Sequence, residues 1–364
     1  MASWRLSCRF CGRPTLVPVD AQTLCCTTCR RITTLQSNSN GYLPSGANGN
    51  FNTMSGNTYA TNPGYAGHGR PNLWNMVRVQ LQPQNAPQPP AAHGRKRAVL
   101  CGITYKGHSK SLKGSINDVL YMKKLLLERF GFPGSSILVL TEEEDISHLP
   151  TKKNIRAAMR WLVQGCQPGD SMVFHYSGHG SQVRDRDGDE LDGYDESLLP
   201  VDYETEGRII DDEINATIVR PLPKGVKLHS IIDTCFSGTF LDLPNVCRIN
   251  RDGFYKWEDH RSHAAYKGTS GGNAISISAC DDHQNSGDTT AFTGAAVGAF
   301  TYSLVQTLKE IPKLTYGQLL NVMRKKIDAA RQEVGLNSNE PHKSQEPQLS
   351  SSDKFEVYTR EFSL

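Results

Sequence analysis

Five short apolar runs, all rich in residues that favour β-strands, constrain the fold of this chain most strongly. They are KRAVLCGITY (96–105), SILVLT (136–141), SMVFHYSG (171–178), VKLHSIIDTC (226–235) and AISISAC (274–280). Runs that stay apolar along their length are typical of parallel strands that are buried on both faces. The sequence therefore predicts a mostly parallel sheet whose strands lie inside the domain.

Segments with helical spacing of apolar residues separate or follow these runs. The expected helices span residues 115–130, 151–165, 298–310 and 315–334, and Thr151 is a candidate N-cap residue of the second. Strands that alternate with helices predict an α/β fold, in which helices cover both faces of the sheet. Because ligands of such sheets bind beyond the carboxyl ends of the strands, functional side chains are expected just after strands.

Composition divides the 364 residues into three regions. Residues 1–36 contain five of the ten cysteines, and residues 93–364 have the texture of a globular domain. Residues 37–92 between them are rich in Gly, Asn, Pro and Gln and contain no lysine or acid, so we expect a flexible linker. No run reaches the roughly 18 apolar residues of a membrane helix, and the N-terminus has no apolar core of a signal peptide. We therefore expect no membrane partner and a reducing compartment, the cytoplasm or also the nucleus.

Four cysteines near the N-terminus have the spacing of a zinc site. Cys8 and Cys11 form one Cys-x2-Cys pair, and Cys26 and Cys29 form a second pair after fourteen intervening residues. Four thiolates suit tetrahedral Zn²⁺, and such a closed site is structural because it leaves no coordination position open. Free thiols in a disordered leader are the alternative, and Cys25 competes with Cys26 for the third ligand position.

The cysteine-rich segment resembles the small zinc finger of plant lesion-simulating-disease proteins. Pro18 and Ala21 match the pattern of that finger, whereas Gly12 stands where arginine is usual and Asp20 replaces the glycine before Ala21. We expect this segment to serve recognition or regulation through a protein partner whose identity the sequence does not reveal. Four cysteines without a helix that could read bases do not point to nucleic acid.

A histidine and a cysteine end two of the apolar runs. His179 lies in SGHG, and Cys235 lies in DTCFSG, 56 residues further on. If the two strands are neighbours, the imidazole can take the thiol proton, which turns the cysteine into a nucleophile. The backbone N–H groups of Gly180 and Cys235 could then hold the oxyanion of a tetrahedral intermediate. Taken singly, Cys235 could be a buried apolar residue and His179 a histidine bonded to a loop carbonyl.

These motifs closely resemble those of the metacaspases, specifically the type I plant metacaspases with an N-terminal zinc finger. The match covers the finger, the linker, KRAVLCGITYKG, LKGSINDV, HYSGHGSQ, GDELDGYDE, IIDDEI, DTCFSG and SACDD. The resemblance implies a caspase-like α/β/α sandwich, with residues 93–255 corresponding to a large subunit and residues 270–364 to a small one. It also implies a self-processing zymogen that is activated by Ca²⁺, cleaves proteins after Arg or Lys, and acts in programmed cell death or the stress response.

Acidic and hydroxyl side chains near the dyad offer a physical reason for a preference for substrates with Arg or Lys at the cleavage site. Asp233 precedes Cys235 by two residues and Ser177 precedes His179 by two, so on a strand each points the same way as its catalytic neighbour. Asp118 could reach the same rim, and the resemblance places pocket carboxylates at Asp118 and Asp233. Together with Ser177 they would form a pocket that attracts a guanidinium or ammonium group. A carboxylate that stabilises a helix N-terminus is the alternative for Asp118.

Residues 181–215 carry thirteen acids against three arginines. The stretch DRDGDELDGYDE (185–196) is not an EF-hand loop, because its sixth position is Glu190 instead of glycine. Hard oxygen ligands suit Ca²⁺, and a solvated acidic loop is the alternative. The resemblance places calcium ligands at Asp195, Asp211, Asp212 and Asp242, and leaves Asp189, Glu190 and Asp192 as supporting or purely solvated charges.

Residues 248–273 are expected to form a polar connection with several Arg and Lys residues before the fifth strand. A peptidase with a basic preference could cut itself there, and Lys267, which precedes a glycine, is the candidate site. The run Arg95-Lys96-Arg97 could similarly release the leader.

Two other functions would use the same features. A protein with a decayed peptidase body could act as a scaffold or adaptor through the zinc finger. The dyad could also transfer an acyl group to an amine, as in a peptide ligase, because the dyad alone does not determine whether water or an amine resolves the thioester.

Overall fold

The computed structural model describes residues 95–235, 237–261, 266–279, 297–333 and 346–364. Elsewhere it describes only the backbone of five short strands, namely β1 (Ser3–Ser7), β2 (Pro14–Pro18), β3 (Thr23–Cys25), β4 (Ile32–Thr34) and β15 (Asp288–Thr289). β1 pairs with β2, and β3 pairs with β4, both antiparallel. The expected linker and the four predicted zinc ligands lie outside the described residues.

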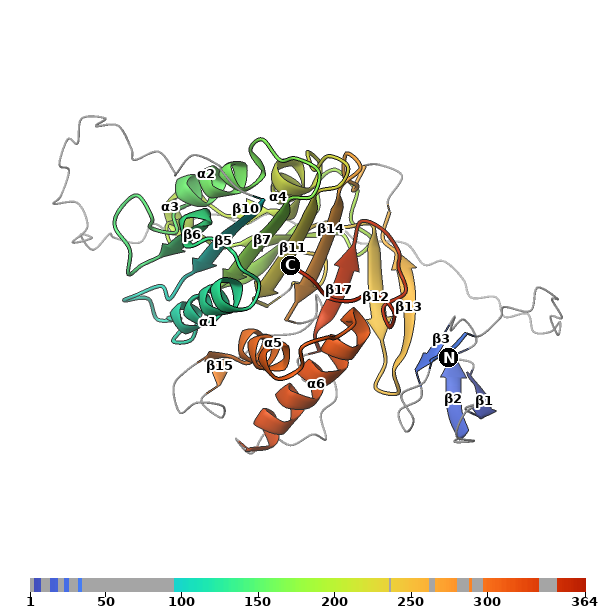
Figure 1. The fold of residues 1–364 in the computed structure, drawn as a ribbon. Coiled ribbons are helices and arrows are strands. Elements are labelled where there is room, and N and C mark those ends of the chain that lie inside the picture. Colours follow the sequence, from blue (N-terminus) through green and yellow to red (C-terminus); the bar gives the residue numbers. More distant parts are fainter. Residues whose placement is uncertain are drawn as a thin grey trace, which may run out of the picture. The chain divides into compact units, whose positions relative to one another are not determined.

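All five predicted strands are present and lie next to one another in one sheet (Figure 1). They are β5 (Lys96–Gly102), β6 (Ile137–Thr141), β7 (Ser171–Ser177), β11 (Lys227–Asp233) and β14 (Asn273–Ser278). They lie in the order β14-β11-β7-β5-β6, and every neighbouring pair is parallel. The order sets β7 and β11 side by side, so the segments that follow them leave the same edge of the sheet.

Alternate residues of the central strands point to opposite faces of the sheet and enter two hydrophobic cores. In β5, Ala98 and Leu100 belong to the first core, whereas Val99 and Cys101 belong to the second. Both faces are therefore apolar, which is why the strand sequences show no polar alternation.

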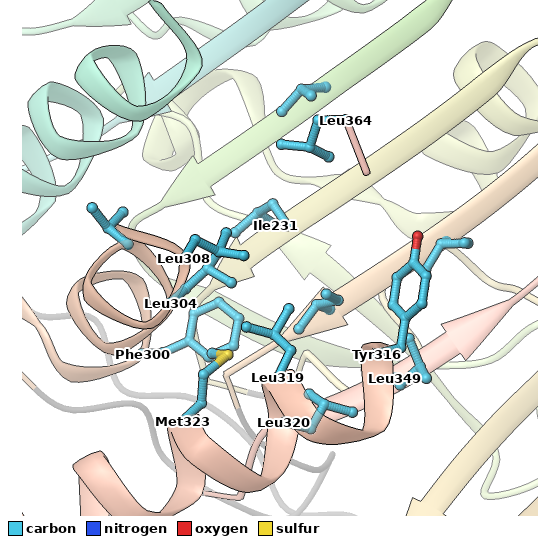
Figure 2. Close-up of a cluster of buried hydrophobic side chains, with 14 of the residues drawn as sticks. Ile231, Phe300, Leu304, Leu308, Tyr316, Leu319, Leu320, Met323, Leu349 and Leu364 are labelled. Atoms are coloured by element: carbon cyan, nitrogen blue, oxygen red, sulfur yellow. The ribbon is translucent and has the colours of Figure 1, made fainter. Parts of the chain in front are cut away.

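Helices cover both faces of the sheet (Figure 1). The first core is closed by α1 (Ser115–Glu128), α5 (Ala299–Glu310) and α6 (Tyr316–Glu333), and the second by α2 (Lys152–Val163), α4 (Asp211–Ile214) and the π-helical turn η3 (Asn215–Val219). Figure 2 shows side chains of α5 and α6 packed against Ile231 of β11. The predicted α/β/α sandwich is confirmed.

Thr151 caps α2 as predicted, because its side chain accepts a hydrogen bond from the backbone N–H of Asn154 at 3.2 Å. None of the helices in the described ranges combines the length and the apolarity that crossing a bilayer requires.

Beyond β14 the sheet continues in antiparallel strands. They are, in spatial order, β17 (Gln348–Ser351), β12 (Asn245–Ile249) and β13 (Phe254–Asp259), followed by β3 and β4. β12 and β13 form a hairpin, so the expectation of a polar connection over residues 248–273 is wrong for its first part. The two strands carry charged side chains at partly or fully exposed positions, here Arg248 and Lys256, which gives them the composition of a loop.

A small antiparallel sheet begins directly after His179. It consists of β8 (Gly180–Arg184), β9 (Tyr194–Leu198) and β10 (Ile209–Ile210). The acidic stretch forms the β8–β9 connection and its flanks. The remaining short elements are η2 (Gly134–Ser136), α3 (Tyr203–Glu206) and β16 (Val297–Gly298), which pairs with β15.

Packing between α6 and the sheet gives a stability prediction. Leu320 is 1% exposed and lies in the first core (Figure 2). We expect Leu320→Ala to lower the free energy of unfolding by about 2–5 kcal/mol, because it removes buried methyl groups and leaves a cavity. Leu120→Ala on α1 is the matched control, since Leu120 is 57% exposed. Urea denaturation measures both, and equal effects of the two changes would contradict the packing described.

Candidate active site

His179 and Cys235 follow two adjacent parallel strands at equal distances. In the β7–β11 ladder Ser177 lies opposite Asp233, so each dyad residue comes two positions after the last paired residue. The N–H of Gly178 donates to the carbonyl oxygen of Asp233 at 3.4 Å, which ties the two segments together past the strand ends. The two strands are therefore neighbours, which is the condition for the proposed dyad.

Gly180 packs directly against the backbone of the nucleophile segment. A Cβ atom at Gly180 would lie 2.5 Å from the carbonyl oxygen of Cys235 and 2.6 Å from Oγ1 of Thr234. Only a residue without a side chain allows this approach. Gly180 and Cys235, the two predicted oxyanion-hole residues, therefore adjoin each other.

The ring of His179 is held by a backbone carbonyl and an aromatic side chain. Its Nε2 lies 2.6 Å from the carbonyl oxygen of Lys110. Because a carbonyl only accepts, Nε2 carries the hydrogen, and in the neutral ring Nδ1 is then the acceptor. The ring also stacks on Tyr105 at 4.6 Å between centroids. This arrangement selects the tautomer in which Nδ1 can receive a thiol proton.

Tyr105 anchors His179 a second time through its hydroxyl group. The backbone N–H of His179 donates to Oη of Tyr105 at 3.0 Å, and Oη donates to the carbonyl oxygen of Leu199 at 2.6 Å. Tyr176 donates to the carbonyl oxygen of His179 at 2.9 Å. Burial raises the pKa of both tyrosines, Tyr105 and Tyr176, so their hydroxyl groups stay protonated and can donate.

The loop that carries Tyr105 is organised by Glu142. Its carboxylate accepts hydrogen bonds from the backbone N–H groups of Tyr105 at 3.0 Å and Lys106 at 2.8 Å, and it also binds Thr104. Tyr105 has a φ of 53°, a left-handed conformation that costs energy for a residue with a side chain. The carboxylate offsets this cost and holds the loop in the shape that presents Lys110 to His179.

Sequence reasoning missed these supports of the imidazole. Tyr105 and Glu142 are separated by 37 residues and neither lies in a motif with His179. Lys110 acts through its carbonyl oxygen, which every residue has, so no side-chain signal could have identified it.

The three predicted pocket residues lie together. Oγ of Ser177 donates to Asp118 at 2.8 Å, and the N–H of Gly298 donates to the same carboxylate at 2.9 Å. Asp233 accepts from the N–H and Oγ1 of Thr301 at 3.0 and 2.8 Å. All three predicted residues are buried, so two carboxylates and a hydroxyl group converge beside the strand ends.

The segment that begins α5 covers both carboxylates. A Cβ atom at Gly298 would lie within 2.6 Å of Oδ2 of Asp118 and closer still to Asp233, so glycine is required there. Asp118 is in the first turn of α1, as its alternative role assumed. Its carboxylate accepts from Ser177 on β7 and Gly298 on β16, and therefore also links α1 to two other elements.

Acidic side chains of the β8–β9 connection gather with others from α4 and from the segment after β11. Three groups have oxygens within 4.8 Å of one another: Asp185, Asp189 and Asp195; Asp187, Asp189 and Asp212; and Asp189, Glu190 and Asp242. Asp189 is common to all three and is 1% exposed, and neither of its oxygens has a hydrogen-bond donor. Of the two alternatives for Asp189, a supporting or a purely solvated charge, the solvated one is wrong, because the fold buries this residue among the other carboxylates.

Three of the four predicted calcium ligands, Asp195, Asp212 and Asp242, belong to these groups. The fourth, Asp211, is directed to backbone donors and accepts from the N–H groups of Glu196 at 2.9 Å and Asp212 at 3.0 Å. Asp192 is exposed and binds only within its own turn, to the N–H of Tyr194. The donor set consists of carboxylate oxygens, which fits a hard cation such as Ca²⁺.

Crowding of like charges shows in the pKa values of this group. Burial, followed by the charges of Asp212 and Asp185, raises the pKa of Asp195 to about 6. Burial and neighbouring carboxylates also raise the pKa values of Asp211 and Asp212. Each shift means that the ionised form is disfavoured until a cation is near.

Comparison with known proteins identifies the family. A family model described as metacaspase, peptidase C14 domain, matches residues 96–244. Metacaspase-3 of Arabidopsis thaliana is 49% identical over 369 residues, which cover 100% of both chains. This chain belongs to the metacaspases. Metacaspase-1 of the same plant is 45% identical and covers 99% of this chain and 96% of its own.

Membership of this family makes the protein a cysteine peptidase. Among solved structures, pro-sf-caspase-1 is similar at a TM-score of 0.44 and 12% sequence identity, covering 77% of this chain and 99% of that chain.

The contact between Tyr105 and His179 gives a test of the site. We expect Tyr105→Phe to keep the stacked ring and lose the hydroxyl group, leaving the N–H of His179 without its acceptor. Such a loss costs about 1–3 kcal/mol, so kcat should fall roughly 5- to 100-fold with little change in KM. Tyr194→Phe is the control, since Tyr194 is 48% exposed. Steady-state kinetics that show equal kcat values for both variants would contradict a positioning role.

Proposed function

We propose that this metacaspase is a calcium-activated endopeptidase that cleaves proteins after Arg or Lys. The observation that carries the proposal is the convergence of Asp118, Ser177 and Asp233 at the strand ends that lead to His179 and Cys235. Two carboxylates favour a cationic side chain and repel an acidic one. The preference for basic residues would then follow from charge.

In the proposed mechanism Nδ1 of His179 takes the proton of the Cys235 thiol, and the thiolate attacks the carbonyl carbon of the scissile bond. The N–H groups of Gly180 and Cys235 stabilise the oxyanion. The imidazolium then protonates the leaving amine as the C–N bond breaks and a thioester forms. Water, deprotonated by the same ring, hydrolyses the thioester and restores the thiol. If an amine resolved the thioester instead, joined peptides would appear among the products.

The pocket carboxylates already accept hydrogen bonds from Gly298 and Thr301. A carboxylate has about four lone-pair sites, so these neutral donors hold each group in place and leave capacity for a cation. At 4 Å and an effective dielectric constant near 20, one such ion pair contributes roughly 4 kcal/mol before the cost of desolvation. The beginning of α5 would thus orient the pocket.

Paired peptide substrates test the pocket. We expect a fluorogenic peptide ending in Arg to be cleaved and its Asp counterpart to remain intact. Asp118→Asn should lower kcat/KM for the Arg peptide about 10- to 100-fold, since it removes one charge and keeps the shape. Asp192→Asn, in the exposed turn, serves as the control. Similar cleavage of the Arg and Asp peptides by the wild-type protein would refute the proposed specificity.

For the calcium part of the proposal, Asp195, Asp211, Asp212 and Asp242 are the proposed ligands, with Asp189 as an addition that its buried, donor-free oxygens support. A bound Ca²⁺ would supply positive charge that lets these carboxylates ionise together. The loops that carry them flank the nucleophile segment, so their ordering would shape the substrate groove.

Calcium removal tests this part. We expect EGTA to abolish peptidase activity and added Ca²⁺, but not Mg²⁺, to restore it, because Mg²⁺ requires a tighter octahedral site. Asp195→Asn should raise the Ca²⁺ concentration for half-maximal activity about tenfold or more, as one ligand charge is lost. Asp192→Asn should leave that midpoint unchanged. Full activity of the wild-type protein in EGTA would refute calcium activation.

We further propose that Cys8, Cys11, Cys26 and Cys29 hold a structural Zn²⁺ and that this finger binds a protein partner. Self-processing at Lys267 and at Arg95-Lys96-Arg97, a role in programmed cell death or stress, and a location in the cytoplasm or nucleus belong to the same proposal. Their support is the sequence spacing and the basic residues at these positions.

A further inference from the structure

Lys267 is the one fully buried lysine among the residues that the structure describes, at 3% exposure. Its Nζ lies 2.5 Å from Asp242, 2.7 Å from Glu190 and 3.5 Å from Asp189. Burying an ammonium group is costly unless opposite charges surround it. The candidate self-cleavage residue thus places its ammonium group among the carboxylates that gather around Asp189, which are called the acidic group below.

One ammonium group does not use the full hydrogen-bonding capacity of the carboxylates around it. Asp189 is within ion-pair range of Lys267, yet both of its buried oxygens have no hydrogen-bond donor. The carboxylates of Asp242 and Glu190 both lie within hydrogen-bond distance of Nζ and hold the lysine as an ammonium group. A single positive charge faces several carboxylates, and a cation with more charge and more coordination sites would satisfy them better.

The backbone around Lys267 lies at the surface while its side chain points inward. The neighbouring Tyr266 is 66% exposed. Its carbonyl oxygen accepts from Arg220 at 3.2 Å, and its hydroxyl group donates to the carbonyl oxygen of Thr269 at 2.8 Å. Among the described residues, the polar contacts of the Lys267 side chain are those of its ammonium group, so expulsion of this group would free the side chain.

Cleavage after Lys267 requires its side chain in the pocket of Asp118 and Asp233. The same ammonium group cannot also lie between Asp242 and Glu190, because these are different sets of carboxylates on different elements. The conformation described here therefore protects the bond between Lys267 and Gly268.

We propose that Lys267 is an internal cation that competes with Ca²⁺ for the acidic group, and that Ca²⁺ binding expels it and exposes the Lys267–Gly268 bond to cleavage. This inference rests on the proposed calcium-dependent peptidase function. In the cleavage, Sγ of Cys235 bonds to the carbonyl carbon of Lys267, the C–N bond to Gly268 breaks, and His179 protonates the new amine. Water then hydrolyses the thioester.

The first test measures calcium binding, in a protein that cannot cut itself. In the Cys235→Ala background, isothermal titration calorimetry should show that Lys267→Met binds Ca²⁺ about tenfold tighter or more. The reason is that the lysine ammonium group no longer competes with Ca²⁺ for the same carboxylates. Methionine keeps the length of the side chain and removes its charge. Lys224→Met is the matched control, since Lys224 is exposed in a nearby loop, and its affinity should equal that of Cys235→Ala alone.

The second test leaves Lys267 unchanged and so does not depend on the folding of a variant. Trypsin cuts after lysine, and mass spectrometry of Cys235→Ala should show cleavage at Lys267 that is slow in EGTA and at least about tenfold faster with Ca²⁺, because trypsin reaches the bond only in the opened state. Cleavage at the exposed Lys354 provides the internal reference and should not change.

The outcomes separate the two proposals. If Cys235→Ala binds Ca²⁺ but Lys267→Met binds it no tighter, or trypsin cuts at Lys267 equally fast without Ca²⁺, the competition is overturned while calcium activation stands. If Cys235→Ala binds no Ca²⁺, calcium activation itself fails, and the competition fails with it.

Discussion

The parallel pairing of β7 with β11 is the constraint on which the site depends. Because Ser177 lies opposite Asp233, the residues two positions further on, His179 and Cys235, leave the sheet at the same edge. The pairing also directs Ser177 and Asp233 to the same face of the sheet, since paired residues of neighbouring strands share a face. A shift of one residue in this register would move one partner of each pair to the opposite face.

This fold stabilises buried carboxylates in two different ways. In the pocket, neutral donors of the segment before and within α5 hold Asp118 and Asp233, and Gly298 makes the close approach possible. In the acidic group, the charge of Lys267 is the counterpart. The first solution uses neutral hydrogen-bond donors, which favour the ionised form of a carboxylate, whereas the second uses the cation of a lysine from another segment of the chain.

Local pattern accounts for most of what could be predicted. The central strands and the long helices were recognisable because each buries one continuous or periodic set of apolar residues. The β12–β13 hairpin was not, because its half-exposed strands carry charges such as Arg248 and Lys256. Burial of Asp189 and Lys267 was equally hidden, since both are charged residues in polar stretches and only contacts across the fold withdraw them from water.

The sequence by itself determined the sandwich, the strand-end positions of His179 and Cys235, and the acidic character of their surroundings, because these follow from short-range periodicity and residue type. The tertiary structure alone decided that Lys110 and Tyr105 orient the imidazole, that Gly298 covers the pocket carboxylates, and that Lys267 neutralises Asp242. The contacts of Lys110 and Tyr105 with His179, and of Gly298 with Asp118, join residues that lie 69 to 180 positions apart in the chain. Such long-range contacts cannot be read from positions along the chain. They are set by the strand order and by the packing of α5 on the sheet.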